Sequence, residues 1–434
     1  MATLKQTLAK NWDELVKELP DDLEVSAKHY GALQRRREVE SAADLLRLIL
    51  IYATVGSLRL TVIWGVCLKI CDISRQDFQR RVHRSAAWLH HLLTKLLQTT
   101  FEPPQLEASM VKRLILRDVS TISRPSSPGT EWRLHLSWYP FLMQPASVTL
   151  TDNSSREGLE TCDVRAGDLI IADRAYGIRR TIQIALDALA YFVIRLTWSN
   201  LPLSTLAGEG FDLPAWLRQI PETTTQREVH VVVRDDSRQR PVRLVAGRLP
   251  PDKAEEAREK VRRQARKEHR EPHPNTLLAA GFCLVLTNLP STVWSTSLVL
   301  ACYRIRWQIE WCFRRWKSLC DLDVLPAYPA AIAEIVLLAK LIIIILMQKR
   351  LGLLPWQEWW AAPEPVPAVS PVVTIIYHRL CDIIRPFDVL DQVLEDPQSF
   401  LRHLRSSHRK RPLQLAEAAQ RFAKLLPNSI PVPP

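Results

Sequence analysis

The segment 303–317 places a single carboxylate, Glu310, among cations and aromatic side chains. We expect this segment to be one α-helix, in which each residue advances about 100° around the axis. On that geometry Glu310 shares a face with Tyr303, Arg306, Arg314 and Lys317. A separate apolar stripe is fit to pack on a sheet and consists of Cys302, Ile305, Ile309, Cys312, Trp316 and Leu319. Taken alone, the charged face is also compatible with a solvated surface, in which Glu310 forms i,i+4 ion pairs with Arg306 and Arg314.

Two aspartates, Asp118 and Asp173, each follow a short apolar run in the sequence. The predicted strands are 114–118 and 168–173, and both end on the acid. A carboxylate in that place is costly unless it is paired, capped or bound to a ligand, although Asp also ends strands simply because it forms turns. If the two strands are neighbours and Glu310 lies nearby, three carboxylates converge on a hard divalent cation. Oxygen-only sites suit Mg²⁺ or Mn²⁺, and two such ions about 3.5–4 Å apart can activate an attacking oxygen and stabilise a leaving one in phosphoryl transfer.

The first 105 residues are predicted to be helical. Ser57 and Ser74 are placed as N-cap residues, and Ser74 is followed by Asp77 in a sequence that resembles a capping box. The predicted helices are 11–19, 36–52, 57–70 and 75–97. Only 71–74 separate the last two, which suggests a helix-turn-helix that binds DNA. A plain helical hairpin with a basic surface fits the sequence equally well. The residues of its second helix that would face DNA are Arg75, Gln76, Gln79 and Arg80.

After Pro103-Pro104 the pattern changes from helical periodicity to strand alternation. Predicted strands at 132–138 and 146–150 are followed by a strand–helix–strand series at 168–173, 178–188 and 191–196. This order predicts an α/β domain with a mixed sheet and flanking helices.

The stretch between Asp173 and Glu310 is longer than one strand and one helix require, which predicts an insertion. The elements expected from there on are strands at 228–234 and 242–248, a charged helix over 251–272, a returning strand at 281–286 and a long, buried apolar helix at 332–351. The charged helix is interpreted either as a solvated surface with salt bridges, which is favoured, or as a contact to DNA.

These patterns divide the chain into five parts. An all-helical DNA-binding domain spans 1–105, the catalytic core spans 106–196 and 279–352, the strand-rich insertion spans 197–278, and a Pro-rich linker with a basic tail spans 353–434. The tail either contacts DNA or is a soluble end, and its basic residues are Arg402, His403, Arg405, His408, Arg409, Lys410 and Arg411.

The composition is basic. The 58 Lys and Arg residues against 46 Asp and Glu leave a net charge of +12 and a pI near 9.4, which favours a polyanionic partner such as nucleic acid. The eight cysteines are scattered without a C-x-x-C pair, so neither zinc nor a disulfide framework is indicated. The N-terminal residues lack a basic region followed by an apolar core, so we do not expect a secretory signal. The longest apolar run, 335–347, contains Lys340 and is too short to span a bilayer. We expect a cytoplasmic, globular protein with no membrane partner and no small-molecule substrate.

The spacing of four residues in the segment 303–317 resembles a family signature. Tyr303, Arg306, Glu310 and Lys317 match the Y-(2)-R-(3)-E-(6)-K pattern of the YREK group of DDE transposases from bacterial insertion sequences. The block 167–176 and the insertion before Glu310 are also similar to that group. Val119 and Ala175 depart from it, since glycine is usual at these positions, but neither change removes a ligand.

The resemblance implies an RNase H-like catalytic domain that holds two Mg²⁺ ions, for which Mn²⁺ can substitute. Its catalytic and metal-binding residues would be Asp118, Asp173 and Glu310. Residues that contact DNA phosphates near the cleaved end would be Tyr303, Arg306 and Lys317, with Arg174 and Arg314 as further cations. In relatives that open the flanking DNA through a hairpin, an aromatic residue of the insertion holds a flipped base. The sequence does not choose among Trp198, Trp216 and Trp294 for that role.

We therefore expect a transposase that binds the terminal inverted repeats of double-stranded DNA as a homodimer. It would hydrolyse the phosphodiester at each transposon end and join the 3′-hydroxyl to target DNA. Two alternatives stay open: an RNase H-like metal-dependent nuclease without strand transfer, and a catalytically retired transposase that acts as a DNA-binding protein.

Overall fold

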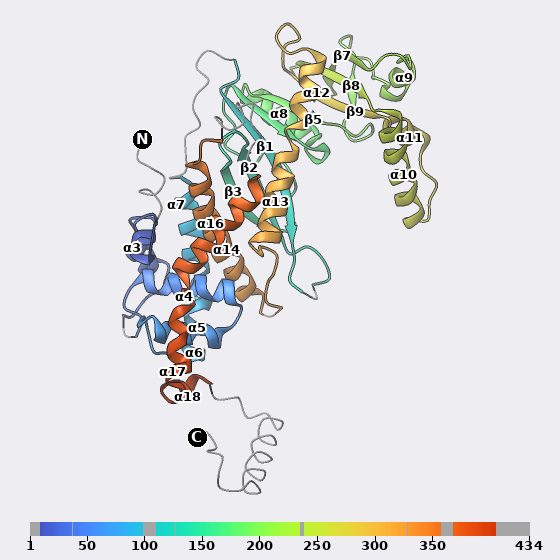
Figure 1. The fold of residues 1–434 in the computed structure, drawn as a ribbon. Coiled ribbons are helices and arrows are strands. Elements are labelled where there is room, and N and C mark those ends of the chain that lie inside the picture. The colour runs from blue at the N-terminus through green and yellow to red at the C-terminus, as the bar shows by residue number, and fades with distance from the viewer. Residues whose placement is uncertain are drawn as a thin grey trace.

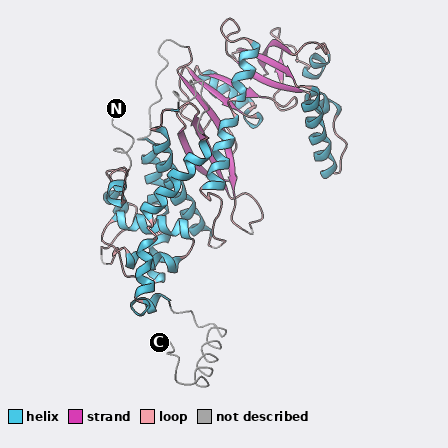
Figure 2. Ribbon diagram, viewed as in Figure 1, coloured by secondary structure: helices cyan, strands magenta, loops and turns pink. Residues whose placement is uncertain are grey.

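One nine-stranded mixed sheet organises the chain, which is a mixed α/β protein. The computed structural model describes residues 9–36, 38–98, 110–125, 127–234, 238–327, 329–356 and 368–404. Helices gather against one half of the sheet, and a smaller group of helices flanks the other half (Figures 1 and 2).

Residues 12–98 are largely helical, as predicted. The helices are α2 (Trp12–Val16), α3 (Leu23–His29), α4 (Ala42–Val55), α5 (Leu58–Cys67), α6 (Arg75–His83) and α7 (Ala86–Gln98). Both predicted N-caps are confirmed, since Ser57 Oγ and Ser74 Oγ accept backbone N–H groups at 3.3 and 3.1 Å. The single helix expected over 75–97 is wrong. It breaks at Ser85, whose hydroxyl donates to the Arg81 carbonyl at 2.9 Å and competes with the helical backbone bonds.

The connection between α5 and α6 runs from residue 68 to residue 74, so it is longer than the predicted turn. α3 was not expected from the sequence.

The first five strands form one half of the sheet. They are β1 (Arg113–Ile122), β2 (Trp132–Tyr139), β3 (Gln144–Asp152), β4 (Asp168–Ala172) and β5 (Tyr191–Arg195). β1, β2 and β3 pair antiparallel, while β4 pairs parallel with both β1 and β5. The short 3-10 helix η1 (Arg174–Tyr176) and the helix α8 (Arg179–Asp187) connect β4 to β5. The expected end of β1 at Asp118 is wrong, because residues 118–122 continue to pair with β2.

The insertion continues the same sheet. Its elements are β6 (Leu203–Ser204), α9 (Leu213–Arg218), β7 (Gln226–Val233), β8 (Pro241–Arg248), α10 (Pro251–Lys267) and α11 (Pro274–Ala279), and the chain then returns to the core in β9 (Phe282–Thr287). The predicted return strand is confirmed, and β9 lies between β5 and β8 in the order β3-β2-β1-β4-β5-β9-β8-β7-β6. The insertion is therefore tied to the rest of the protein through backbone hydrogen bonds, with α10 and α11 beside its strands (Figure 1).

A buried helix, α14 (Ala330–Gly352), lies at the centre of the helical layer. It contacts α4, α7 and β3. Among the described residues, it is the one helix long and apolar enough to cross a membrane, but 83% of its most apolar window is buried inside the protein. Lys340 is also buried, and its Nζ donates to the carbonyls of Asp321 and Val324 at 2.6 and 2.8 Å. The prediction of a buried helix is confirmed.

The segment 368–404 is helical, although the sequence suggested only a linker and a tail there. It contains α16 (Val369–Ile384), η2 (Asp388–Leu390), α17 (Asp391–Glu395), η3 (Pro397–Phe400) and α18 (Leu401–Leu404). α16 packs against α4 and α14, and Trp64 Nε1 donates to the Pro386 carbonyl at 3.2 Å. This segment is therefore part of the helical layer. The basic residues from Arg405 onward lie outside the described residues.

Candidate active site

Asp118 and Asp173 come from neighbouring parallel strands. The last registered pair of β1 and β4 directly precedes the two acids, so the predicted adjacency of their strands is confirmed. Asp118 Oδ1 accepts the N–H of Val119 at 2.8 Å, and Asp173 Oδ1 accepts the N–H of Ala175 at 2.8 Å. These local bonds orient both carboxylates at the point where the parallel pairing ends.

The segment 303–317 is not one helix. α12 (Thr296–Arg304) ends and α13 (Trp307–Leu319) begins on either side of Ile305 and Arg306. The N–H groups of these two residues bond three residues back, to Cys302 and Tyr303, instead of four. The apolar stripe is nevertheless confirmed, since its six residues are buried or partly buried: Cys302, Ile305, Ile309, Cys312, Trp316 and Leu319.

Arg306, at the junction of these helices, lies between two of the acids. Its Nη2 donates to Glu310 Oε1 in a short ion pair, and its Nη1 lies 3.4 Å from Asp118 Oδ2. Only 9% of the Arg306 side chain is exposed. We expected the cations of this segment to hold phosphates instead of pairing with Glu310. In the DNA-free protein, Arg306 does pair with Glu310 and contacts Asp118, and its contact with a phosphate stays a prediction.

The acids repel one another. Burial raises the pKa of Asp118 to about 7, and the nearby charges of Asp173 and Glu310 raise it as well. The Val119 N–H and the Arg306 guanidinium work in the opposite direction. Burial opposes the charge on Arg306, but Tyr303 and the two acids outweigh burial and raise the pKa of this group. The site thus favours a cation among its carboxylates.

The chemistry of this donor set fits a hard divalent cation. Asp118, Asp173 and Glu310 offer only oxygen ligands, and a cationic group already stands between two of them. Among the described residues, no group of three or more His, Cys, Asp or Glu side chains is close enough to hold a metal ion as it stands.

The other predicted phosphate-binding residues of the segment 303–317 have different surroundings. Tyr303 is buried, and the Arg306 guanidinium lies 5.8 Å from the centre of its ring. Lys317 Nζ donates to the Thr121 carbonyl of β1 at 3.0 Å, so it holds α13 against the sheet. Arg314 is exposed and lies over the Trp311 ring.

A cleft opens beside the acids, between the core and the insertion. Its volume is about 740 Å³, and its lining includes Asp173, Glu310, Arg174, Arg195 and Lys260. A second cleft of about 620 Å³ shares Arg195 and Lys260 with it. Within the described part of the chain, these two cations form no ion pair with a carboxylate. Neither was expected from the sequence, although Arg195 ends β5, the strand next to that of Asp173, and this position was detectable.

The charged helix α10 has two different faces. On the outer face, Arg262 pairs with Glu255 and Glu259, and Arg266 pairs with Glu259. The face that carries Lys260 lines both clefts. Ion pairs occur on both faces, because Lys253 pairs with Glu256 at 2.7 Å beside the second cleft, but Lys260 itself has no carboxylate partner among the described residues.

The three candidate tryptophans of the insertion occupy different places. Trp198 lines the cleft and stacks on His273, with ring centres 5.2 Å apart. Trp216 is buried in the core cluster against which Trp198 also packs, and Trp294 packs against the core of the helical layer. Of the three, only Trp198 is near the acids.

The four residues of α6 that were predicted to face DNA are not brought to the acidic cluster. Arg75, Gln76 and Arg80 are exposed, Gln79 is half-buried, and Arg80 pairs with Asp77 at 2.6 Å. α6 lies at the end of the helical layer away from α12 and the insertion (Figure 1).

Known proteins are similar to this chain over the part that carries the acidic cluster. Residues 146–346 match the family described as Transposase DDE domain, a range that contains Asp173 and Glu310. The InsL protein of insertion sequence element IS186A from Escherichia coli K12 is 34% identical over 341 residues, which cover 76% of this chain and 91% of that protein. The transposase of insertion sequence element IS421 from Escherichia coli is 34% identical over 342 residues, with the same two coverages.

Two further similarities are more distant. The transposase of insertion sequence element IS231F from Bacillus thuringiensis subsp. israelensis is 26% identical over 355 residues, which cover 70% of this chain and 72% of that protein. The cryo-EM structure of the piggyBac transposase synaptic complex with hairpin DNA superposes with a TM-score of 0.44 at 10% identity, over 99% of this chain and 88% of that one. From the extent of the match to the IS186 and IS421 proteins, this chain belongs to the DDE transposase family of insertion sequences.

Proposed function

We propose that this transposase cuts and joins DNA by two-metal phosphoryl transfer at Asp118, Asp173 and Glu310. The observation that carries the proposal is the convergence of the acids: Asp118 and Asp173 follow the same parallel strand pair, and Glu310 is linked to Asp118 through Arg306. When bound, two Mg²⁺ or Mn²⁺ ions would activate the attacking oxygen and stabilise the leaving one. The three carboxylates would hold these ions.

We further propose that the core is RNase H-like and that the acids belong to a YREK-type site. The strand order β3-β2-β1-β4-β5, with β4 parallel to its two neighbours, supports this assignment. So does the position of Glu310 on a helix that packs on β1. The five-part division at 105, 196, 278 and 352 is part of the same proposal, with α5 and α6 as a helix-turn-helix that binds the terminal repeats.

Arg306 has two successive roles in this proposal. Without DNA and metal its guanidinium neutralises Asp118 and Glu310, and this keeps the repelling carboxylates together. With metal held by the carboxylates, the Arg306 guanidinium would be free to donate to a DNA phosphate. Tyr303 and Lys317 would position the same strand.

Two cations without a carboxylate partner among the described residues, Arg195 and Lys260, would extend the DNA-binding surface beyond the acids. Arg195 and Lys260 line both parts of the cleft, and charge-assisted hydrogen bonds from such groups fix the register of a backbone without reading its sequence. Synapsis of two transposon ends would require a dimer on DNA, and the reaction would take place in the cytoplasm.

The test is strand cleavage and strand transfer with duplexes that carry the inverted repeats flanking the gene. Asp173→Asn and Glu310→Gln should abolish both reactions in Mg²⁺ and largely preserve binding in a mobility-shift assay. Glu255→Gln, on the outer face of α10, is the matched control and should react normally. Full cleavage by the Asp173 or Glu310 variant would overturn the proposal, and cleavage without joining by the wild type would leave a nuclease.

A further inference from the structure

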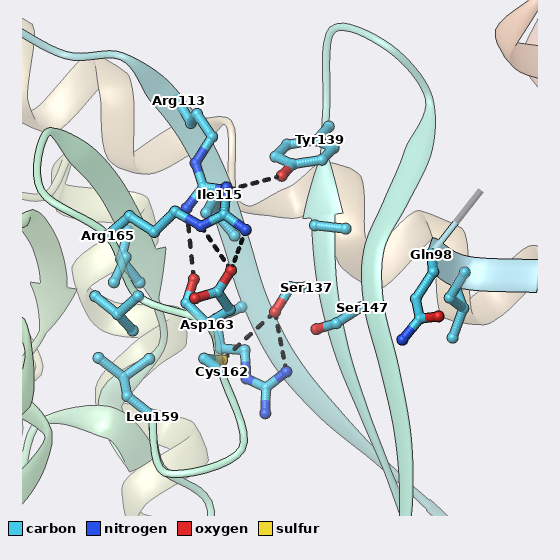
Figure 3. A pocket seen from close by; sticks show the side chains of 15 residues that line it. Gln98, Arg113, Ile115, Ser137, Tyr139, Ser147, Leu159, Cys162, Asp163 and Arg165 are labelled. Carbon is cyan, nitrogen blue, oxygen red and sulfur yellow. Dashed lines mark hydrogen bonds and ion pairs between the residues drawn. The ribbon is translucent and has the colours of Figure 1, made fainter. Parts of the chain in front are cut away.

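A pocket separate from the two clefts described above lies on the other face of β1, away from Glu310 and α13. Its volume is about 280 Å³, and it is lined by residues of β1, β2, β3 and the segment 159–165. Arg113, Tyr139, Asp163 and Arg165 gather at one end of it, and Ser147 and Gln98 lie toward the other (Figure 3). No part of the proposed cleavage site lines this pocket.

Arg117 lines this pocket and carries a buried charge without a counter-ion. It has no solvent-exposed surface. Its Nη1 donates to Ser137 Oγ at 3.1 Å and its Nη2 to Thr161 Oγ1, both neutral acceptors. Within the described residues no carboxylate lies at ion-pair distance from it. Two other buried arginines differ in this respect, since Arg243 pairs with Glu228 and Arg350 pairs with Glu18.

The remaining arginines of the pocket are already neutralised. Arg113 donates to both oxygens of Asp168, each at 2.6 Å. Arg165 donates through Nε to Asp163 at 2.6 Å. Two positive and two negative groups therefore cancel, and the charge of Arg117 is left over. An isolated buried cation of this kind is costly, and a bound anion would remove the cost.

Unused hydrogen-bonding groups point to the same kind of ligand. Arg117 Nε and Ser147 Oγ are buried and have no partner among the described residues. A hydroxyl and a guanidinium N–H are both donors to an oxyanion. The pocket thus combines one uncompensated positive charge with unsatisfied donors in a space suited to a small tetrahedral ion.

We propose that this pocket binds a phosphate group, with Arg117 as the charged ligand and Ser147 as a neutral donor. The phosphate comes either from free phosphate or from the backbone of DNA. The proposal does not depend on the proposed cleavage mechanism, since it concerns different residues on a different face of β1.

Inorganic phosphate is the probe, with sodium chloride at equal ionic strength as the reference. Phosphate should raise the Tm of the wild-type protein, and calorimetric titration should show binding. Arg117→Met should bind phosphate at least roughly tenfold more weakly, because a hydrogen bond to a charged group contributes about 1.5–3 kcal/mol. The Met variant should still fold, since exchanging a buried charge for an apolar side chain is often neutral or stabilising. Ser147→Ala should show a smaller loss.

The control is Arg133→Met on β2, because Arg133 has a carboxylate partner in Glu157. It should bind phosphate like the wild type. Equal affinity in the wild type and Arg117→Met would overturn the proposal, as would the absence of any phosphate-specific effect on the wild type.

A duplex DNA competitor separates the two sources of phosphate. If the pocket takes a backbone phosphate, DNA should displace inorganic phosphate, and Arg117→Met should lower the salt dependence of DNA binding by about one phosphate contact. If the pocket takes the free ion, both DNA binding and its salt dependence should be unchanged in the variant. Either result supports the phosphate site and identifies its occupant.

Discussion

Replacing Arg306 by glutamine is the sharpest test of how the acidic cluster is held together. The guanidinium is 9% exposed, and it contacts Asp118, which is 15% exposed, and Glu310, which is 37% exposed. The substitution keeps a polar side chain but removes the charge. Two carboxylates then face each other and Asp173 without a cation.

The expected loss of stability follows from the two contacts. The pair with Glu310 is partly solvated, which limits its contribution to about 0–1 kcal/mol. A fully buried pair that loses one partner costs about 3–5 kcal/mol, but Asp118 lies 3.4 Å from Arg306 and can take up a proton instead. We therefore expect Arg306→Gln to lower the free energy of unfolding by about 1–3 kcal/mol at pH 8.

The loss should depend on pH. The pKa of Asp118 is about 7, above the ordinary value of 3.8, so this carboxyl is ionised at pH 8 and mostly neutral at pH 6 in the folded protein. The contact with Arg306 therefore matters above pH 7 and is lost as Asp118 protonates. Urea unfolding at both pH values should show a smaller difference between wild type and variant at pH 6.

Mg²⁺ should distinguish the two proteins. A divalent ion must displace Arg306 in the wild type but not in the variant, so Mg²⁺ should raise the Tm of Arg306→Gln more than that of the wild type. Arg314→Gln, an exposed cation on the same helix, should respond like the wild type. A pH-independent loss together with equal responses to Mg²⁺ would refute the reasoning.

Three further outcomes are expected. Lys260→Gln should weaken DNA binding and reduce the slope of log K against log salt by about 0.9. Arg262→Gln should change this slope less, because the guanidinium of Arg262 is already neutralised on the outer face of α10. Fluorescence anisotropy at several salt concentrations measures both slopes, and equal effects of the two variants would argue against DNA in the cleft. Burial lowers the pKa of His135 from 6.5 to about 4, and the charges of Arg117 and Arg133 lower it as well. Between pH 6.5 and pH 4 the unfolded chain therefore protonates this histidine while the folded protein does not, so the free energy of unfolding should fall as the pH drops through this range. His135→Asn should have a shallower acid limb in thermal unfolding, and parallel curves would contradict this. Lys340→Met should cost about 1–3 kcal/mol in urea unfolding, because the carbonyls of Asp321 and Val324 lose a donor that lies in a partly buried place. Lys267→Met, at the exposed end of α10, should stay within about 0.5 kcal/mol.

The sequence by itself determined the features that depend on local structure. The strands 132–138 and 191–196 were predicted nearly at their observed bounds, because alternation and apolar runs are read within a few residues. The N-caps at Ser57 and Ser74 were predicted for the same reason. The apolar stripe of 302–319 was also correct, since burial of one helix face survives the small break at 305–306.

The tertiary structure alone decided the features that join distant segments. β1 continues past Asp118 because β2 pairs with it, and the strands of the insertion extend the main sheet because β9 lies between β5 and β8. The partners of Arg306 and Arg117 could not be predicted from the sequence either. Arg306 reaches Asp118 across 188 positions of the chain, and Arg117 is left without a carboxylate by the fold around it. Local periodicity indicates which face of an element is buried, but the charges that meet there are set by which elements pack together.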